Sequence, residues 1–220
     1  MILKLDSFTK YIKRKVISSP KYWKIRHFIE PSWVSAYEHK KTNEFYFDYL
    51  KKSSFNSLLD FGCATGKTMY DLKLKFPDLL SYGIEINENA LSRAEHIFSN
   101  IDNTGRSFSF QSKLNESDIK IFLKTHSLKR FDLAIFDRVL YCLSDKEIND
   151  IFLIVTKFVN EVFIDDFMYD QSFKAIGYKH RKWNEIFAKF GFKCSINIPS
   201  IYSEVEGANP RSMTFIRDNV

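Results

Sequence analysis

The stretch that decides the fold is LLDFGCATGKT, residues 58–68. An apolar run ends at Asp60, and two glycines, Gly62 and Gly66, follow it. A short apolar run that stops at glycine is typical of a buried strand, and the segment after Gly66 has helical spacing. The stretch therefore predicts a strand, a tight turn and a helix, the arrangement with which nucleoside-binding folds hold their ligand.

Two phosphate-binding motifs fail here on spacing. The P-loop pattern GxxxxGK[ST] needs four residues between its glycines, whereas Gly62 and Gly66 are separated by three and Phe61 stands where the first glycine should be. The dinucleotide pattern GxGxxG would need glycine where the chain has Ala64 and Lys67. ATP and dinucleotides are therefore disfavoured, and the closing Gly-Lys-Thr is expected simply to open a helix.

The rest of the chain alternates between strand-like and helical patterns. Strands are predicted at 57–61, 80–86, 107–112, 131–137 and 161–167, with a C-terminal pair at 192–198 and 211–218. Helices are predicted at 67–76, 88–100, 115–126, 144–159 and 180–190. This alternation predicts an α/β fold with a doubly wound sheet covered on both faces, whose ligand lies at the carboxyl ends of the strands.

The pattern D-x-G-x-x-x-G is met in full by Asp60, Gly62 and Gly66, and Glu85 follows at the end of the next predicted strand. Here the chain resembles motif I of the class I S-adenosylmethionine-dependent methyltransferases, and SYGIEINENAL (81–91) is similar to their second motif. The resemblance covers about residues 35–217. It implies a Rossmann-like, seven-stranded, mostly parallel sheet with one reversed strand, and S-adenosylmethionine as the cofactor.

The resemblance also implies which residues bind the cofactor. They are Asp60, Gly62, Cys63, Gly66, Glu85, Ile86 and Asp137. Small residues allow the backbone to approach the methionine part, and a carboxylate near the strand end can receive its ammonium group. Glu85 is placed to accept both ribose hydroxyls in a bidentate contact.

One position departs from the family pattern. Many relatives bind the adenine amino group with an Asp in the loop after the third strand, where this chain has Ser112 and Lys113. Asn115, Glu116 or a backbone carbonyl remains for that role.

The segment FDLAIFDRVLYCL (131–143) is similar to the fourth-strand motif of the family and ends its strand at Asp137. DRVL is not the NPPY-like sequence of DNA amino-methyltransferases, and no cysteine follows a proline as in cytosine-C5 enzymes. DNA-base methylation of these kinds is therefore disfavoured.

Methylation of a hydroxyl needs a general base, for which the candidates are His180 and Asp166. A surface position at the start of a helix explains His180 equally well. Alternatively, Asp137, Asp165 and Asp166 hold a divalent cation, as in catechol-type O-methyltransferases. Those enzymes follow the strand-five Asp with Asn, whereas Phe167 follows Asp166 here, so we expect no metal.

Residues 1–50 are predicted to form a helical extension or lid, and residues 51–220 the methyltransferase domain. Helical spacing begins near residue 33, and Trp33, Tyr37 and His39 either close over the ligands or pack against the sheet. The basic run KYIKRK (10–15) either touches an anionic substrate or forms a solvated helix face.

Composition places the protein in the cytoplasm. The three cysteines lack zinc spacing, and the N-terminus has no signal-peptide pattern. The most apolar stretch, 151–164, contains Lys157, Asn160 and Glu161, so no membrane span is expected. The net charge of +6 suggests anionic partners only weakly.

The sequence therefore predicts an S-adenosylmethionine-dependent methyltransferase that methylates a hydroxyl of a small molecule, a sugar or a cell-surface precursor. N-methylation of a small amine comes next. RNA comes third, because the chain has no recognisable nucleic-acid-binding appendage. The alternative from another class is a non-catalytic protein that binds S-adenosylmethionine.

Overall fold

The computed structural model describes residues 41–102, 107–168, 180–200 and 210–218. Its helices are α4 (Lys41–Ser53), α5 (Lys67–Lys75), α6 (Glu88–Ser99), α7 (Glu116–Thr125), the 3₁₀ turn η1 (Leu140–Cys142), α8 (Asp145–Val155) and α9 (Trp183–Ala188). Its strands are β1 (Ser57–Phe61), β2 (Leu80–Ile84), β3 (Phe108–Gln111), β4 (Phe131–Asp137), β5 (Val159–Phe167), β6 (Phe192–Pro199) and β7 (Pro210–Arg217).

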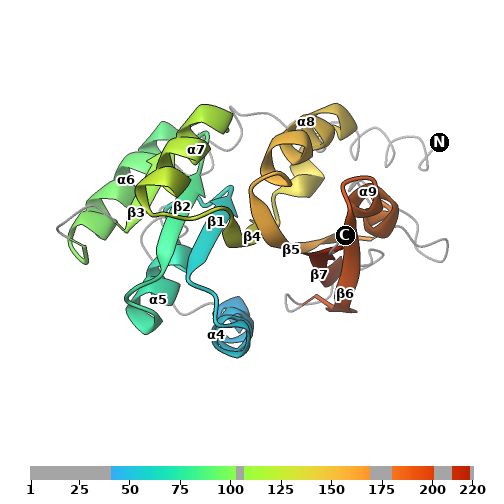
Figure 1. Ribbon diagram of the computed structural model, residues 1–220, viewed down its shortest axis with the longest axis horizontal. Helices are drawn as coiled ribbons and strands as arrows, with labels where there is room; N and C mark the ends of the chain where they lie inside the picture. Colours follow the sequence, from blue (N-terminus) through green and yellow to red (C-terminus); the bar gives the residue numbers. More distant parts are fainter. Residues whose placement is uncertain (1–40, 103–106, 169–179, 201–209, 219–220) are drawn as a thin grey trace, which may run out of the picture.

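The strands form one seven-stranded sheet in the order β3-β2-β1-β4-β5-β7-β6 (Figure 1). Strands β1 to β5 run parallel, and β7 lies antiparallel between β5 and β6. The predicted doubly wound, mostly parallel sheet is confirmed. The strand order reverses between β1 and β4, which is where ligands of such sheets bind.

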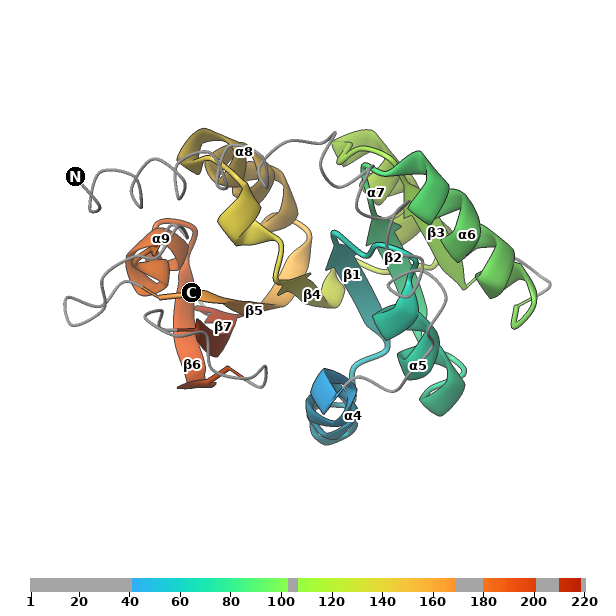
Figure 2. The same ribbon diagram turned by 180° about the vertical axis from the view of Figure 1, so that it is seen from behind.

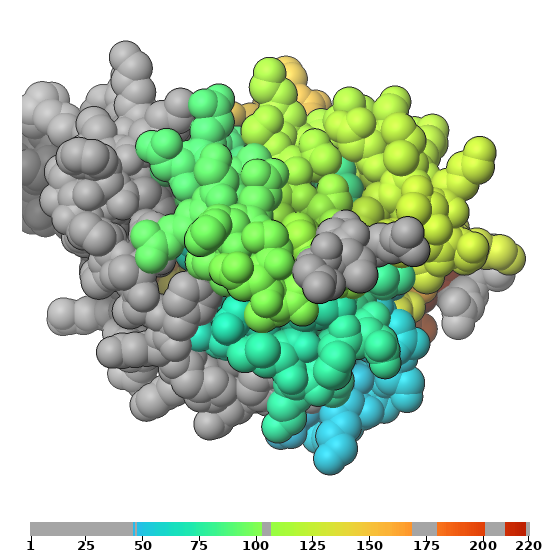
Figure 3. All heavy atoms as spheres, turned by 90° about the vertical axis from the view of Figure 1, so that its left-hand side faces the viewer, coloured from blue at the N-terminus to red at the C-terminus, as the bar shows by residue number. Residues whose placement is uncertain are grey.

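Helices cover both faces of the sheet. Figures 1 and 2 show α4 and α5 on one side and α7 and α8 on the other. Because successive strand residues point to opposite faces, Leu58 packs with the α4, α5 and α6 layer, and Leu59 packs with the α7, α8 and α9 layer. Figure 3 shows the side on which β3 lies, where α6 and α7 form the upper surface and α5 and α4 the lower.

Two predicted helix starts, at Asn87 and at Ser144, are confirmed. The Asn87 side chain accepts the N–H groups of Asn89 and Ala90 at the start of α6. Ser144 and Glu147 form the expected capping box at the start of α8.

Two predicted helices are longer than the observed ones. The helix predicted to continue to residue 159 ends at Val155, where the Thr156 hydroxyl donates to Phe152 O at 2.5 Å and the chain turns so that β5 begins at Val159. The helix predicted over 180–190 is formed only over Trp183–Ala188. The apolar spacing that predicted these two helices extends beyond their observed ends. After α8, the residues from Val159 onward instead pair with β4 as strand β5.

Helix α4 runs across the predicted domain boundary at residue 50. The Tyr46 ring packs edge-on against Phe163 of β5 at 5.1 Å, and the Tyr49 hydroxyl donates to Glu161. The division at residue 50 stays a prediction. Trp33, Tyr37, His39 and the basic run at 10–15 lie outside the described residues. Among the helices that are described, none is long and apolar enough to cross a membrane.

Gly83 of β2 tests how closely the core is packed. A Cβ at this position would lie 2.6 Å from Cδ1 of Phe110 and 2.8 Å from Sγ of Cys63. We expect Gly83→Ala to lower the free energy of unfolding by about 1–3 kcal/mol through overpacking. Urea denaturation measures the loss.

The control is Gly191→Asn, because Gly191 has φ +75° and open space around its Cβ position. Asparagine tolerates this left-handed conformation, so we expect a loss below about 1 kcal/mol. Equal stability of Gly83→Ala and the wild type would contradict the close packing of β2 against β3.

Candidate functional site

The turn between β1 and α5 is built from three residues in the left-handed conformation. Gly62, Ala64 and Gly66 have φ values of 78°, 51° and 72°. The N–H groups of Gly62 and Cys63 both donate to the carbonyl of Ile84, at 2.7 and 3.1 Å. The turn is therefore held against the end of β2.

Both glycines of the turn are required by their neighbours. A Cβ on Gly62 would lie 2.8 Å from Cγ2 of Val139, in the loop after β4. A Cβ on Gly66 would lie 3.2 Å from the Phe98 ring and 3.3 Å from the Phe110 ring. The D-x-G-x-x-x-G spacing thus reflects both backbone conformation and close packing.

Glu85 lies directly after β2 and is fixed by two backbone donors. Its Oε2 accepts the N–H of Ala64 at 3.0 Å, and its Oε1 accepts the N–H of Asn87 at 2.8 Å. Only 8% of the residue is exposed, and this burial raises the pKa of Glu85, which backbone N–H groups partly lower. Each carboxylate oxygen has two lone-pair sites, so each can accept a further hydrogen bond from a hydroxyl.

A second carboxylate, Asp60, is 4% exposed at the end of β1. Burial raises the pKa of the Cys63 thiol well above its ordinary value, and the charges of Asp60 and Glu85 raise it further. Both carboxylates therefore lie close enough to Cys63 to act on its thiol, and the turn is acidic. Such a site attracts cations and hydroxyl donors and repels phosphate.

Lys67 begins α5, as expected for an ordinary helix start. Its Nζ pairs with the Asp71 carboxylate at 2.6 Å, one turn further along the helix. The lysine that suggested a phosphate-binding loop therefore makes an intrahelical ion pair.

Three further residues considered for cofactor binding, Ile86, Asn115 and Glu116, follow strands β2 and β3. Ile86 is 51% exposed beside Glu85, so it presents an apolar surface next to the carboxylate. The Asn115 side chain accepts the N–H of Ser117 and caps α7. Glu116 pairs with Lys120 on the same helix and with Lys157, which lies between α8 and β5. Both residues left open for the adenine amino group thus have interactions within the protein.

Three acidic residues share one face of the sheet. Asp60 pairs in register with Ile135 of β4, and Asp137 pairs with Asp165 of β5. Since residues two apart on a strand share a face, Asp60, Asp137 and Asp165 all lie on the side of α4 and α5. The structure therefore brings the predicted cofactor residues of β1, β2 and β4 to one edge of the sheet.

Asp165 is not arranged as a metal ligand. Its oxygens accept the hydroxyls of Ser200 and Ser212, and Oδ1 lies 2.5 Å from Nε of Arg138. Within the described residues, no group of three or more His, Cys, Asp or Glu side chains is placed to hold a metal ion.

The predicted catalytic residues Asp166 and His180 are not brought together. Adjacent strand residues point to opposite faces, so Asp166 and Phe167 leave β5 on opposite sides, and the half-buried His180 ring stacks on Phe167 at 5.9 Å. Asp166 is completely buried, and burial raises its pKa to about 7. Its Oδ2 has no hydrogen-bond partner in the described part of the chain. The catalytic roles of both residues stay predictions.

The loop after β4 contains residues that the sequence did not single out. Arg138 has φ +56°, and its guanidinium lies 5.3 Å from the Phe167 ring. Arg181 donates to the carbonyls of Leu140 and Leu143. The sequence signal that could have indicated Arg138 is an arginine directly after a strand-end Asp. From the sequence alone, DRVL argued only against DNA-base methylation.

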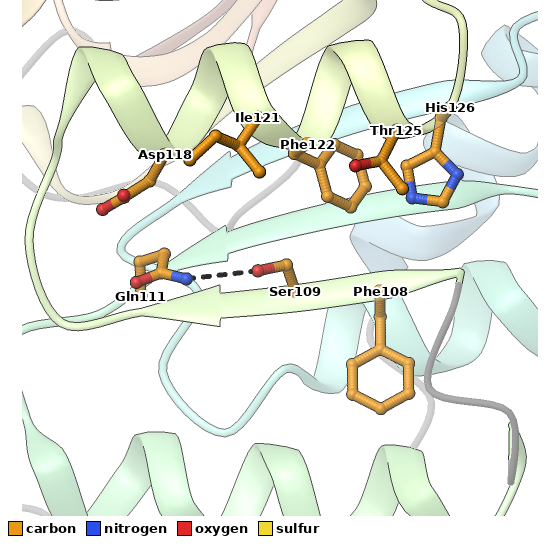
Figure 4. A pocket seen from close by; sticks show the side chains of 8 residues that line it. All are labelled: Phe108, Ser109, Gln111, Asp118, Ile121, Phe122, Thr125 and His126. Atoms are coloured by element: carbon orange, nitrogen blue, oxygen red, sulfur yellow. Dashed lines mark hydrogen bonds between the residues drawn. The ribbon is translucent and has the colours of Figure 1, made fainter.

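A separate hollow of about 570 Å³ lies along the outer strand of the sheet (Figure 4). It is lined by three residues of β3 and by the facing side of α7 with its C-cap residue, His126. None of the predicted site residues lines it, so it is distinct from the site at the strand ends.

A family described as "Methyltransferase domain" matches residues 52–191. The chain belongs to this family. It is a class I methyltransferase, and the family uses S-adenosylmethionine as methyl donor. No curated protein sequence matches the methyltransferase.

Several solved structures share its fold. The magnesium protoporphyrin IX methyltransferase of Synechocystis PCC 6803, solved with bound S-adenosylmethionine, superposes with a TM-score of 0.61 at 14% identity, over 95% of this chain and 97% of that chain. The methyltransferase domain of bacterial CtHen1-CN has a TM-score of 0.59 at 14% identity, over 80% and 97%. The mitomycin 7-O-methyltransferase MmcR has a TM-score of 0.55 at 14% identity, over 75% of this chain and 50% of that chain.

The residues at the strand ends fit this cofactor. S-adenosylmethionine carries an ammonium, a sulfonium, a carboxylate and two ribose hydroxyls, and it carries no phosphate. Two buried carboxylates, Asp60 and Glu85, beside a turn that excludes side chains at Gly62 and Gly66, match cationic and hydroxyl groups.

Asp166 makes the stability of the methyltransferase depend on pH. Its pKa rises from 3.8 to about 7 in the folded protein. Between pH 4 and 7 the folded state keeps a proton that the unfolded state releases, so the free energy of unfolding falls as pH rises. We expect Asp166→Asn to remove roughly 2–4 kcal/mol of this fall, measured by urea denaturation at pH 5 and pH 8. If the free energy of unfolding fell equally with pH in the variant and the wild type, this role of Asp166 would be contradicted.

Proposed function

We propose that this methyltransferase transfers its methyl group to a hydroxyl oxygen of a small molecule, a sugar or a cell-surface precursor. The observation that carries the proposal is the half-buried imidazole of His180, held against Phe167 at the carboxyl end of β5. A neutral hydroxyl is a weak nucleophile, and histidine is the side chain best suited to remove its proton near neutral pH. A similar fold also belongs to a named O-methyltransferase, mitomycin 7-O-methyltransferase.

The cofactor roles in this proposal follow from the hydrogen-bonding and charged groups of the site. Glu85 would accept the two ribose hydroxyls, because each of its oxygens already holds one backbone N–H and has capacity for another donor. Asp60 would receive the ammonium group, directly or through water. Bound S-adenosylmethionine supplies an electrophilic methyl group on its sulfonium.

The remaining cofactor residues shape the site. Gly62, Cys63 and Gly66 would let the backbone approach the methionine part, because any larger residue at either glycine meets a neighbouring side chain. Ile86 would cover the adenine with its exposed side chain. Asp137 would lie beside the reacting groups at the end of β4.

The base is assigned to His180 alone. Asp166, predicted with it, has no exposed surface and points to the other face of β5. In the proposal, the His180 imidazole takes the hydroxyl proton while the protein excludes water and aligns the oxygen with the methyl group.

The alternatives are a small amine or RNA as acceptor, or a purely binding function, and the panel of acceptors described below distinguishes them. The three free cysteines, Cys63, Cys142 and Cys194, are those expected of a protein in a reducing compartment, so a cytoplasmic location remains part of the proposal.

The role of Glu85 is tested by Glu85→Gln. The amide keeps the shape but loses the charge and turns an N–H₂ group toward the backbone donor of Ala64 or Asn87. We expect affinity for S-adenosylhomocysteine to fall roughly 10- to 100-fold, the loss typical of charged hydrogen bonds. Isothermal titration calorimetry measures it.

Glu88→Gln is the matched control, because Glu88 is exposed in the first turn of α6 and three residues away. Its affinity should equal that of the wild type. Equal affinities in all three proteins would remove Glu85 from the ribose role.

The role of His180 is tested with a panel of hydroxylated compounds, amines and RNA, with the methylated atom identified by mass spectrometry and NMR. We expect an O-methylated product. With that acceptor, His180→Gln should lower kcat about 100-fold, and turnover should recover as the pH rises and the hydroxyl ionises without help. Methylation only of amines or RNA would refute the proposal, and normal turnover of the variant would dismiss His180 as base.

A further inference from the structure

The loop after β4 packs directly on the turn that binds the cofactor. Val139 is the residue whose side chain requires glycine at position 62, with Cγ2 only 2.8 Å and Cβ 3.1 Å from where a Cβ of Gly62 would lie. Gly62 opens the left-handed turn with φ +78°. The position of Val139 therefore limits how far this turn can move.

The neighbouring residue, Arg138, fixes this end of the loop through contacts with Asp165 and Ser200. Its N–H donates to the carbonyl of Asp165 at 3.1 Å, and its Nε lies 2.5 Å from Oδ1 of the same residue. Its Nη2 donates to the hydroxyl of Ser200 at 2.8 Å. Arg138 is one of few non-glycine residues with a left-handed backbone in the described chain, a conformation that persists only where surrounding contacts hold it.

Asp165 joins three segments of chain around this arginine. Its carboxylate is fully buried and accepts the hydroxyl of Ser212 on β7 at 2.5 Å and the hydroxyl of Ser200 after β6 at 2.8 Å. A carboxylate buried to this degree is tolerated only when it is paired and hydrogen-bonded. Its partners are thus held in one arrangement, and the loop after β4 is held with them.

The other end of the loop is fixed by Arg181. Its guanidinium donates to the carbonyls of Leu140 and Leu143 and pairs with Asp145 at 3.0 Å. Because both ends are anchored, a change at Asp165 acts mainly on Arg138, which contacts it, and on Val139, the next residue in the chain.

We propose that the Asp165–Arg138 pair is a positioning device for the cofactor turn: it presses Val139 onto Gly62 and so sets the affinity for S-adenosylmethionine, although Asp165 has no exposed surface with which to touch the cofactor. The inference rests on the cofactor of the family and is independent of which atom accepts the methyl group. A displacement of about 1 Å at a binding site is enough to lower binding or rate by orders of magnitude.

The test is a double-mutant cycle with affinity for S-adenosylhomocysteine as the readout, measured by calorimetry. We expect Asp165→Asn to weaken binding about 10-fold, because the ion pair with Arg138 is lost, and Val139→Ala to weaken it about 5-fold. If Asp165 acts through Val139, the double variant binds about as weakly as Asp165→Asn alone. A product of the two losses, roughly 50-fold, would overturn the proposal, as would unchanged affinity of Asp165→Asn.

The matched control is Asp132→Asn at the amino end of β4. Asp132 also accepts three hydrogen bonds, from the N–H of Asn56 and from the N–H and hydroxyl of Ser57. It lies five residues, roughly 17 Å, from the strand end that holds Asp137. We expect it to lower Tm like Asp165→Asn while leaving cofactor affinity unchanged, and an equal loss of affinity would show that general destabilisation explains the effect and refute the proposal.

Ser200→Ala keeps the test decisive if Asp165→Asn does not fold. This change removes only the hydroxyl that lies between Asp165 and Arg138. We expect affinity about threefold weaker than in the wild type, with no further loss when Val139→Ala is added. Wild-type affinity in Ser200→Ala would overturn the proposal. A failure to find O-methylation, by contrast, refutes the proposed function and leaves these affinities as they are.

Discussion

The site depends on one contact, the carboxylate of Glu85 between the backbone N–H groups of Ala64 and Asn87. The bond to Ala64 holds a non-glycine residue in the left-handed conformation and so closes the turn between Gly62 and Gly66. The bond to Asn87 fixes the residue that caps α6. One buried side chain therefore joins the end of β2 to the turn after β1 and to the next helix. The residue proposed to bind the ribose is therefore also part of the architecture.

The parts of this arrangement that were predictable from the sequence are local. Apolar runs of five to seven residues ending at glycine or an acid predicted the strands, and Asn87 and Ser144 predicted helix starts, because a cap satisfies N–H groups two or three residues away. The spacing of Gly62 and Gly66 predicted the turn, because glycine readily adopts the left-handed conformation that a tight turn requires. Each of these features needs only neighbouring residues to form.

The loop after β4 was not predictable, because its conformation depends on residues distant in sequence. Arg138 is left-handed through contacts with Asp165 and Ser200, and Val139 acquires its role only by meeting Gly62. For Asp166 the sequence did contain the needed information. Two adjacent acids on a strand point to opposite faces, so only one of the pair could share a face with Asp137, and register assigns that place to Asp165.

The charge of the site is opposite to that of the chain. The net charge is +6, yet Asp60, Glu85 and Asp137 lie together at the strand ends. Net charge is a sum over the whole chain, so an acidic site can occur in a protein in which basic residues outnumber acidic ones. With the roles proposed above, these carboxylates face a ligand whose ammonium, sulfonium and carboxylate sum to one positive charge before methyl transfer. They sum to zero after it, when the sulfonium has become a neutral thioether. Coulomb attraction to the lining is therefore weaker for the product than for the substrate. With these proposed roles, the acidic lining that disfavours phosphate also favours the methyl donor over the spent cofactor.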